Sequence, residues 1–337
     1  MGVRIGRFEH KHIVHWGVVG QHAVWPLSGT YPTLRALLTA ESRAVQLGQA
    51  ALAQEGIPLS EVRWLSPVDH GAQVVCQGVN YAGHRREGGY APEKPSFNTI
   101  FTKASSAICG PNDDVIRPPH VRLLDYEVEL GVVISKAITE QVNITPENLC
   151  QYVAGIVITN DISARDVQIP QGQWIKGKSY RTFCPVGPYL YLLDDGEGDV
   201  IDDLELKLWV NGDLRQSAST SQLLFKPAET LAELSGVMDL FPGDLLMTGT
   251  PSGVALKMPQ PLIKKLTSLL VSEDKQMDMF VRRQLQIPAY LQDGDLIRAI
   301  IRSPSGHVDL GVQENRVVRA SLRGRVPPAA SQPSQRG

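Results

Sequence analysis

From Val74 onward, turns rich in Gly, Pro, Asn and Asp divide the chain into short apolar segments. Segments of about four to eight residues between such turns are typical of β-strands. Few of the intervening stretches have helical spacing, which favours a sheet that curls into a sandwich or barrel over a doubly wound sheet. The sequence therefore predicts a β-rich α+β fold. The predicted strands are residues 74–79, 97–102, 126–134, 154–160, 185–193, 204–211, 244–248 and 295–301, and the predicted helices are 145–152 and 227–238.

Residues 1–70 differ in character from the segments that follow them. Residues 13–19 and 21–25 predict a pair of strands, and residues 33–55 have the apolar spacing of an amphipathic helix. A helix beside paired strands predicts a small N-terminal α/β domain. The pattern changes after Pro67, so we place the start of a second, strand-rich domain at residue 71.

The strand-rich domain is predicted to cover residues 71–320 and to contain a helical insertion. Residues 257–291 show amphipathic spacing over one or two helices, between a Gly-rich turn and the strand that follows Gly294. Beyond residue 320 the composition shifts to Pro, Ser and Gln. Segments of this kind bury too little apolar surface to fold, so residues 321–337 are predicted to be a disordered tail.

Charge and cysteine content exclude several classes of protein. Lys plus Arg number 33 and Asp plus Glu number 35, and this near balance argues against nucleic acid or a membrane as the partner. There is no run of about 18 apolar residues and no apolar core near the N-terminus, so neither a spanning helix nor a secretory signal is expected. Four scattered cysteines without a C-x-x-C pair predict no zinc knuckle and no disulfide framework, and a reduced, cytoplasmic setting is expected.

The most specific chemical signal is an acidic pattern on a predicted strand. Glu127 and Glu129 are two residues apart in the run 126–134, so on a strand both side chains project from one face. Two adjacent carboxylates repel, and a divalent cation bound by both would remove this cost. Asp161 follows the apolar strand 154–160 and could supply a third ligand. Ligands that are all oxygen favour Mg²⁺, Mn²⁺ or Ca²⁺ over zinc.

Each of these polar residues has a simpler interpretation when it is taken alone. Glu127 and Glu129 could face solvent on a half-exposed strand, and Asp161 could be a turn residue or a helix cap. His84 and Glu87 are three residues apart, so a helical turn would pair them as a dyad, but they could also be surface neighbours. A carboxylate beside the imidazole raises its basicity, which suits a histidine that activates water.

Two further segments could contact an anionic ligand. Lys178 could offset the negative charge of a bound carboxylate or enolate, although a single lysine in a loop is usually just solvated. The Gly-rich turn at residues 248–253 could present backbone N–H groups and a hydroxyl to an anion, although it could also be a plain turn. This turn matches neither the P-loop nor the dinucleotide-binding pattern.

Taken in order, these segments resemble the fumarylacetoacetate hydrolase family, in particular its smaller bacterial-type members and the related acylpyruvases and oxaloacetate decarboxylases. The resemblance covers residues 70–256 and 290–318, and the N-terminal unit is similar to that family's small leading domain. Each motif is weak by itself, but so many in the same order are very specific. They are Gly78-x-Asn80-Tyr81-x-x-His84-x-x-Glu87, Phe101-x-Lys103, Gly110-Pro111, Asp125-Tyr126-Glu127-x-Glu129-Leu130, Asn160-Asp161-x-Ser163-x-Arg165-Asp166-x-Gln168, Gly177-Lys178-Ser179, Pro185-x-Gly187-Pro188, Val210-Asn211-Gly212, Pro242-Gly243-Asp244 and Thr248-Gly249-Thr250-Pro251-x-Gly253-Val254.

The resemblance implies a mixed β-sandwich roll, usually in a homodimer, for the catalytic domain at residues 71–320. It implies an Mg²⁺ or Mn²⁺ ion, or sometimes Ca²⁺, held by Glu127, Glu129 and Asp161. It also implies that a histidine and a glutamate form a water-activating dyad on a segment that closes over the substrate as a lid. In this chain the matching positions are His84 and Glu87.

The resemblance further assigns residues that contact the substrate. Lys178 is expected to stabilise the developing enolate as a third catalytic residue. Gln168, Thr250, Tyr81 and Arg165 are the expected substrate-binding residues. All of these positions carry the residue types that the family pattern requires.

Substrates of this family share a 2-oxo acid or 1,3-dicarbonyl unit. The resemblance therefore predicts a metal-dependent hydrolase that cleaves a C–C bond in an acylpyruvate or a fumarylacetoacetate-like acid. Decarboxylation of an oxaloacetate-type acid, and isomerisation or hydration of a dienoic 2-oxo acid, remain alternatives because these activities share most of the site. A non-catalytic metal-binding scaffold is the alternative outside enzymes. The insertion at 257–291 departs from the family pattern and leaves the substrate open.

Overall fold

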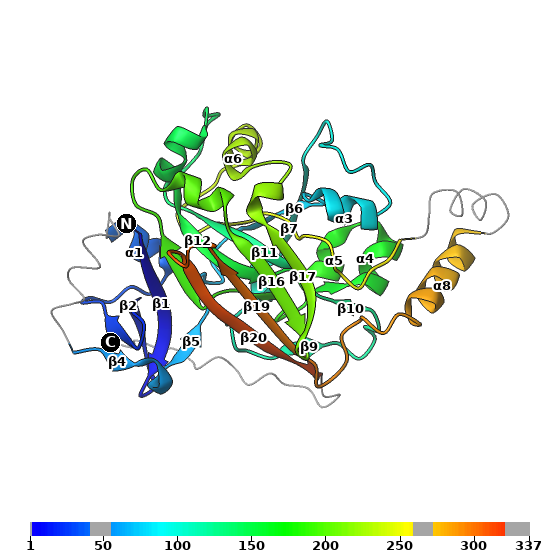
Figure 1. Ribbon diagram of the computed structural model, residues 1–337, viewed down its shortest axis with the longest axis horizontal. Helices are drawn as coiled ribbons and strands as arrows, with labels where there is room; N and C mark the ends of the chain where they lie inside the picture. Colours follow the sequence, from blue (N-terminus) through cyan, green and yellow to red (C-terminus); the bar gives the residue numbers. More distant parts are fainter. Residues whose placement is uncertain (1, 41–54, 259–271, 321–337) are drawn as a thin grey trace, which may run out of the picture.

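A computed structural model of the protein describes residues 2–40, 55–258 and 272–320. Within these residues, the largest feature is an eleven-stranded sheet that joins the N-terminal segment to the centre of the molecule (Figure 1). Its strands in spatial order are β4 (Ile57–Pro58), β3 (Ala23–Pro26), β2 (Ile13–Val19), β1 (Val3–His10), β15 (Tyr189–Leu192), β12 (Val153–Asn160), β11 (Val128–Ile134), β18 (Leu245–Met247), β6 (Val74–Gly78) and β7 (Thr99–Lys103), with β5 (Arg63–Leu65) paired to β1.

A second sheet packs across the central strands of the first. In the described part of the chain it has five strands, in the order β17 (Asp213–Ser219), β16 (Glu205–Val210), β19 (Leu296–Arg302), β20 (Asp309–Arg319) and β9 (Val115–Arg117). Alternate residues of β16 are buried, as expected for a strand with one face toward a core. Figure 1 shows β16, β19 and β20 crossing β11 and β12, and their buried side chains belong to one core cluster. The protein is therefore a two-layer β-sandwich.

Strands β11 and β12 lie at the centre of this sandwich. Every residue of both strands is buried, and they pair antiparallel from Val128 with Asn160 onward. Continuous apolar runs of this kind occur where a sheet is covered on both faces. A polar side chain on either strand is therefore placed in the interior, which fixes the environment of Glu129 and of Asp161 next to the end of β12.

Helices cover the sandwich at several places, and α3, α4 and α5 lie together beside the ends of β6 and β7 (Figure 1). Among the described residues, no helix is long and apolar enough to cross a membrane. The helices are α1 (Leu34–Ala40), α3 (Ala82–Glu87), α4 (Arg165–Gln171), α5 (Trp174–Lys178), α6 (Pro227–Ser235) and α8 (Glu273–Gln284), with 3₁₀ turns η1 (Leu59–Glu61), η2 (Ser105–Ala107), η3 (Pro146–Gln151), η4 (Gly198–Asp202) and η5 (Thr220–Gln222). Two short strand pairs, β8 (Ile108–Cys109) with β14 (Cys184–Pro185) and β10 (Leu124–Asp125) with β13 (Ser163–Ala164), complete the fold.

The structure confirms the predicted β-rich α+β fold with a small N-terminal α/β part. The predicted strand 126–134 begins two residues late, at Val128, because the Glu127 N–H donates to the side chain of Asn160 instead of to a strand backbone. Strands β1, β17 and β20 were not predicted. The domain boundaries at residues 70 and 320 stay predictions. Strand β1 pairs with β15, so the sheet continues across the predicted boundary at residue 70.

Part of the predicted helical sequence lies outside the described residues. Of the helix predicted at 33–55, α1 is described and residues 41–54 are not. Of the insertion predicted at 257–291, α8 confirms one helix, and residues 259–271 lie outside the description. The tail at 321–337 lies outside it as well.

Candidate active site

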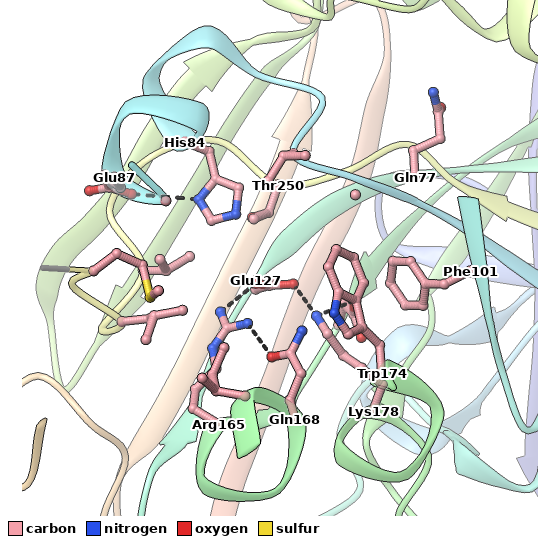
Figure 2. A pocket seen from close by; sticks show the side chains of 18 of the residues that line it. Gln77, His84, Glu87, Phe101, Glu127, Arg165, Gln168, Trp174, Lys178 and Thr250 are labelled. Carbon is pink, nitrogen blue, oxygen red and sulfur yellow. Dashed lines mark hydrogen bonds and ion pairs between the residues drawn. The ribbon is translucent and has the colours of Figure 1, made fainter. Parts of the chain in front are cut away.

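A cavity of about 140 Å³ lies between α3 on one side and α4 and α5 on the other (Figure 2). The start of β11 forms its floor, and the segment after Thr250 closes another side. The polar and charged residues in its wall are Gln77, His84, Glu87, Glu127, Glu129, Asp161, Arg165, Gln168, Lys178 and Thr250. With the exception of Tyr81, every residue that the sequence predicted for the site lines this one cavity.

The three predicted metal ligands converge in the cavity. Ligand oxygens of Glu127, Glu129 and Asp161 all lie within 4.8 Å of one another, and all three residues are buried. The Asp161 N–H donates to the Glu127 carbonyl oxygen at 2.8 Å, which holds the end of β12 beside the start of β11. The alternative in which these carboxylates face solvent is therefore wrong.

Buried cations surround Glu127 and Asp161. Lys178 Nζ lies 2.5 Å from Glu127 Oε2 and 2.6 Å from Asp161 Oδ2, and Arg165 also contacts Glu127. Lys103 contacts Asp161 from the other side. Burial alone would raise the pKa of the Glu127 carboxyl, but Arg165 and Lys178 outweigh it and hold that pKa far below its ordinary value.

Glu129 has a different environment. Its Oε2 accepts the Gly249 N–H at 2.9 Å, and the described part of the chain forms no ion pair with it. Burial, followed by the nearby charges of Asp161 and Glu127, raises the pKa of Glu129 well above its ordinary value. A buried carboxyl group without an ion-pair partner among the described residues, beside two further carboxylates, is the donor set that a divalent oxygen-seeking cation fits.

The predicted dyad is formed by α3. His84 Nδ1 lies 3.6 Å from Glu87 Oε2 on the adjacent turn, which is longer than a hydrogen bond. Figure 2 shows the His84 ring directed into the cavity, on the opposite side from Arg165, Gln168 and Lys178. The Gly253 N–H donates to both oxygens of Glu87, at 3.1 and 3.0 Å. The ring therefore faces the acidic triad across the cavity.

The four predicted substrate-binding residues have different positions. Gln168 lines the cavity and accepts a hydrogen bond of 2.9 Å from Arg165, which also contacts Asp125 and Glu127. Thr250 lines the cavity, but its hydroxyl donates to the Val128 carbonyl and accepts from Gln216. Their roles toward substrate stay predictions.

Tyr81 is the exception among the predicted site residues. Its side chain is buried in the protein interior and does not line the cavity, and its hydroxyl has no hydrogen-bond partner among the described atoms. Burial, followed by the nearby charge of Glu129, raises the pKa of this hydroxyl. Tyr81 therefore lies behind the site, and direct contact with substrate would require its displacement.

Sequence reasoning assigned no role to Lys103 or Asp125, although both support the site. Lys103 is buried at the end of β7 and donates to the Phe183 carbonyl at 2.8 Å as well as contacting Asp161. Asp125 accepts the N–H groups of Ala255 and Leu256 and pairs with Arg165. Two features of the sequence could have identified them: Lys103 lies within an apolar strand, and Asp125 is a third acidic residue just before Glu127.

The apolar wall of the cavity was not predicted from the sequence either. The Phe101 and Trp174 rings pack edge to face with centroids 4.9 Å apart, and both line the cavity. Further apolar lining comes from Ile169, Val254, Leu256 and Met258. The charged floor is thus enclosed by apolar side chains, which strengthen electrostatic interactions within it.

Two protein families match the chain. The family described as "Fumarylacetoacetate (FAA) hydrolase C-terminal" matches residues 73–318, and the one described as "Rv2993c-like, N-terminal" matches residues 3–67. A Rattus norvegicus protein named "Oxaloacetate tautomerase Fahd2a, mitochondrial" is 38% identical over 246 residues, which cover 71% of this chain and 75% of that protein.

Solved structures show the same fold. A fumarylacetoacetate hydrolase from Exiguobacterium antarcticum is 29% identical with a TM-score of 0.72, covering 94% of this chain and 100% of that one. A maleylpyruvate hydrolase from Sphingobium sp. SYK-6, solved with manganese and pyruvate, is 26% identical with a TM-score of 0.69 over the same shares of the two chains. These similarities extend over both the N-terminal part and the sandwich.

Proposed function

Because the chain belongs to the fumarylacetoacetate hydrolase family, we propose that it is a divalent-metal-dependent enzyme that interconverts the enol and keto forms of a small 2-oxo acid. The observation that carries this proposal is the single cavity in which His84 and Glu87 face the acidic triad. A histidine–carboxylate pair is suited to moving a proton, and tautomerisation needs only proton transfer. The similarity to an oxaloacetate tautomerase supports this choice.

The metal would be held by Glu127, Glu129 and Asp161. We propose Mg²⁺ or Mn²⁺, with Ca²⁺ as a third possibility, because hard cations prefer oxygen ligands. Manganese is present in the related maleylpyruvate hydrolase structure. A cation at this place supplies Lewis acidity to the oxygens of a 2-oxo acid.

The protein residues would then transfer one proton between C3 and the oxygen on C2. Nδ1 of His84 faces Glu87, which leaves Nε2 to take the proton from C3 of the keto form and deliver it to the enolate oxygen on C2. In the reverse direction Nε2 takes the proton of the enol hydroxyl and delivers it to C3. Glu87 stabilises the imidazolium that exists between these steps. Lys178 places positive charge near the oxygen that carries charge in the enolate. The apolar wall limits access of water to this intermediate.

Hydrolysis of a C–C bond is the second candidate, and the similarity to a maleylpyruvate hydrolase favours it. The same dyad could take a proton from water instead of from carbon, and the resulting hydroxide would attack the distal carbonyl. Decarboxylation of an oxaloacetate-type acid would need no such water. The three reactions differ in their products, so one assay separates them.

The test uses the purified full chain with Mg²⁺, Mn²⁺ or chelator. Enol oxaloacetate is followed by its ultraviolet absorbance, and acylpyruvates and oxaloacetate are analysed for products by mass. We expect metal-dependent loss of enol absorbance without a change in mass, and its absence in a Glu129→Gln control. Cleavage products from acylpyruvates would establish hydrolysis instead. Absence of turnover with every substrate would favour the non-catalytic scaffold.

Two further expectations remain proposals. We propose a homodimer, which sedimentation of the full chain would reveal as twice the monomer mass.

We also propose a cytoplasmic location, although the name of the rat relative places that protein in mitochondria. Imaging of a tagged full-length chain in its own cell would decide between these compartments.

A further inference from the structure

Besides the His84 ring, Glu87 has a charged neighbour, Lys257. Lys257 Nζ lies 2.7 Å from Glu87 Oε1, and the Met258 N–H donates to the Glu87 carbonyl at 3.4 Å. Lys257 belongs to the segment 253–258, which we call the strap. The strap crosses the end of α3 and contributes Val254, Leu256 and Met258 to the cavity wall.

Side chains hold the strap at its middle and near its C-terminal end. Asp125 accepts the N–H groups of Ala255 at 2.8 Å and Leu256 at 3.1 Å. At Lys257 the backbone is held by Gln284, whose Nε2 donates to the Lys257 carbonyl at 2.6 Å and whose Oε1 accepts the Lys257 N–H at 3.3 Å. The Gln284 amide thus forms hydrogen bonds with both the N–H and the carbonyl of Lys257, as the backbone of a neighbouring β-strand would.

Gln284 is the last residue of α8 and is buried, as is Val281 of the same helix. Gln284 is only 2% exposed, whereas Arg282 and Met279 of the same helix are exposed. Tyr290 also donates to Gln284 Oε1 at 2.7 Å, so the amide oxygen accepts two hydrogen bonds while the amide nitrogen donates to Lys257. These bonds orient the buried amide, and the amide in turn holds the backbone of Lys257.

We propose that Lys257, held in place by Gln284 of α8, is a positioning residue that fixes the ionised Glu87 carboxylate toward His84. This inference rests on the proposed function of the dyad. It gives the helical insertion a role at the site: α8 anchors the strap, and the strap supplies the cation. Lys257 touches neither the cavity nor, by this proposal, the substrate.

The charges around Glu87 agree with this role. Burial raises its pKa, but the His84 ring, Lys257 and the Gly253 N–H together outweigh burial and hold the pKa of Glu87 below its ordinary value. The Lys257 side chain is half exposed while that of Glu87 is 20% exposed, so solvent screens the pair in part. We therefore expect an effect on turnover that is moderate and not total.

The experiment compares Lys257→Met with Lys257→Arg in the full chain with Mn²⁺. We expect Lys257→Met to lower kcat by roughly two- to tenfold with little change in KM, because the dyad acts after substrate binds. Lys257→Arg should retain most of the wild-type kcat. Lys275→Met is the matched control, since Lys275 is an exposed lysine of α8 that forms no ion pair with the residues described by the structure, and it should match the wild type.

A second variant tests the anchor. Gln284→Leu keeps the size of the side chain but removes its bonds to the Lys257 backbone, and it should reproduce the kcat loss of Lys257→Met. The ring signals of His84 in the NMR spectrum of the metal-free chain give a readout that needs no substrate. We expect these signals to shift in Lys257→Met and Gln284→Leu and to be unchanged in Lys275→Met.

Unchanged kcat and unchanged His84 signals in Lys257→Met would overturn the proposal. A loss that arginine does not restore and that comes with a lower Tm would overturn it too, because that result marks a structural role. If Gln284→Leu alone matches the wild type, the anchoring by α8 is wrong. If the wild type converts no 2-oxo acid, the proposed function fails, while the NMR comparison still decides this inference.

Discussion

Glu127 and Glu129 line the same cavity, but in the described part of the chain only Glu127 forms ion pairs with buried cations. Arg165 and Lys178 contact Glu127, whereas the described partner of Glu129 is the backbone N–H of Gly249. The pKa values of the two carboxyls are accordingly shifted in opposite directions. Glu127 takes part in ion pairs with buried cations and Glu129 does not in the described part of the chain, so substitutions of the two residues should have different consequences.

Glu129→Gln should remove metal binding and leave the fold intact. The variant loses one of three ligand carboxylates but leaves no buried cation without a partner. We expect Mn²⁺ affinity to fall by more than the roughly 10- to 100-fold typical of residues that only support a ligand. Isothermal titration measures the affinity, and circular dichroism checks the fold. Wild-type affinity in this variant would exclude Glu129 as a ligand.

Glu127→Gln should destabilise the chain as well as weaken the metal site. The substitution leaves the buried charges of Arg165 and Lys178 short of one carboxylate. Breaking a buried ion pair from one side costs on the order of 3 kcal/mol, so the free energy of unfolding should fall by about this amount. Urea denaturation of the metal-free variants measures it, with Glu129→Gln as the matched control. Equal stabilities would show that these pairs do not stabilise the fold.

The stability of the metal-free chain should depend on pH through Glu129. The pKa of Glu129 is higher in the folded than in the unfolded chain. The stabilisation that Glu129 contributes to the fold is therefore complete at pH values below its pKa in the unfolded chain. It is lost as the pH rises through its pKa in the folded chain. The free energy of unfolding of the wild type should therefore fall relative to that of Glu129→Gln as pH rises. Denaturation at a series of pH values in chelator tests this. A constant difference between the two would contradict the shift.

His84→Gln should separate metal binding from chemistry. The side chain is not a predicted ligand, and the amide cannot act as a base near neutral pH. We expect unchanged Mn²⁺ affinity and a loss of kcat of about 100- to 10,000-fold, which is the usual contribution of a general base. Titration and steady-state kinetics measure the two quantities. Full turnover in this variant would move the proton-transfer role to another group.

Sequence spacing indicated candidate groups where the site depends on local geometry, and the resemblance to a family selected among the alternatives. The spacing of Glu127 and Glu129 and the position of Asp161 after a strand allowed a triad, and these residues meet because β11 and β12 are neighbours in sequence and in space. The three-residue spacing of His84 and Glu87 allowed a dyad, because α3 is a regular helical turn. Rules based on residue spacing apply where the interacting residues lie on one helix or strand or on two adjacent ones.

The charge network could not be predicted in this way. Lys103 and Asp161 are 58 residues apart, and Glu127 and Lys178 are 51 apart, so their contacts depend on the tertiary fold. Helices α4 and α5 were missed because Pro170 and Gly177 interrupt the helical pattern. A Cβ at Gly177 would lie 2.7 Å from the Gln168 Cβ, so glycine permits the close packing of these helices.

The pairing of β1 with β15 has a consequence for any shortened version of the chain. Val3 to Gly6 of β1 pair with Tyr189 to Leu192 of β15. Deleting residues 1–70 would strip β15 of this neighbour and leave unpaired N–H and C=O groups along an open edge, a template for contact with other molecules. A recombinant fragment that starts at residue 71 should therefore aggregate, even though it would keep every residue that lines the cavity.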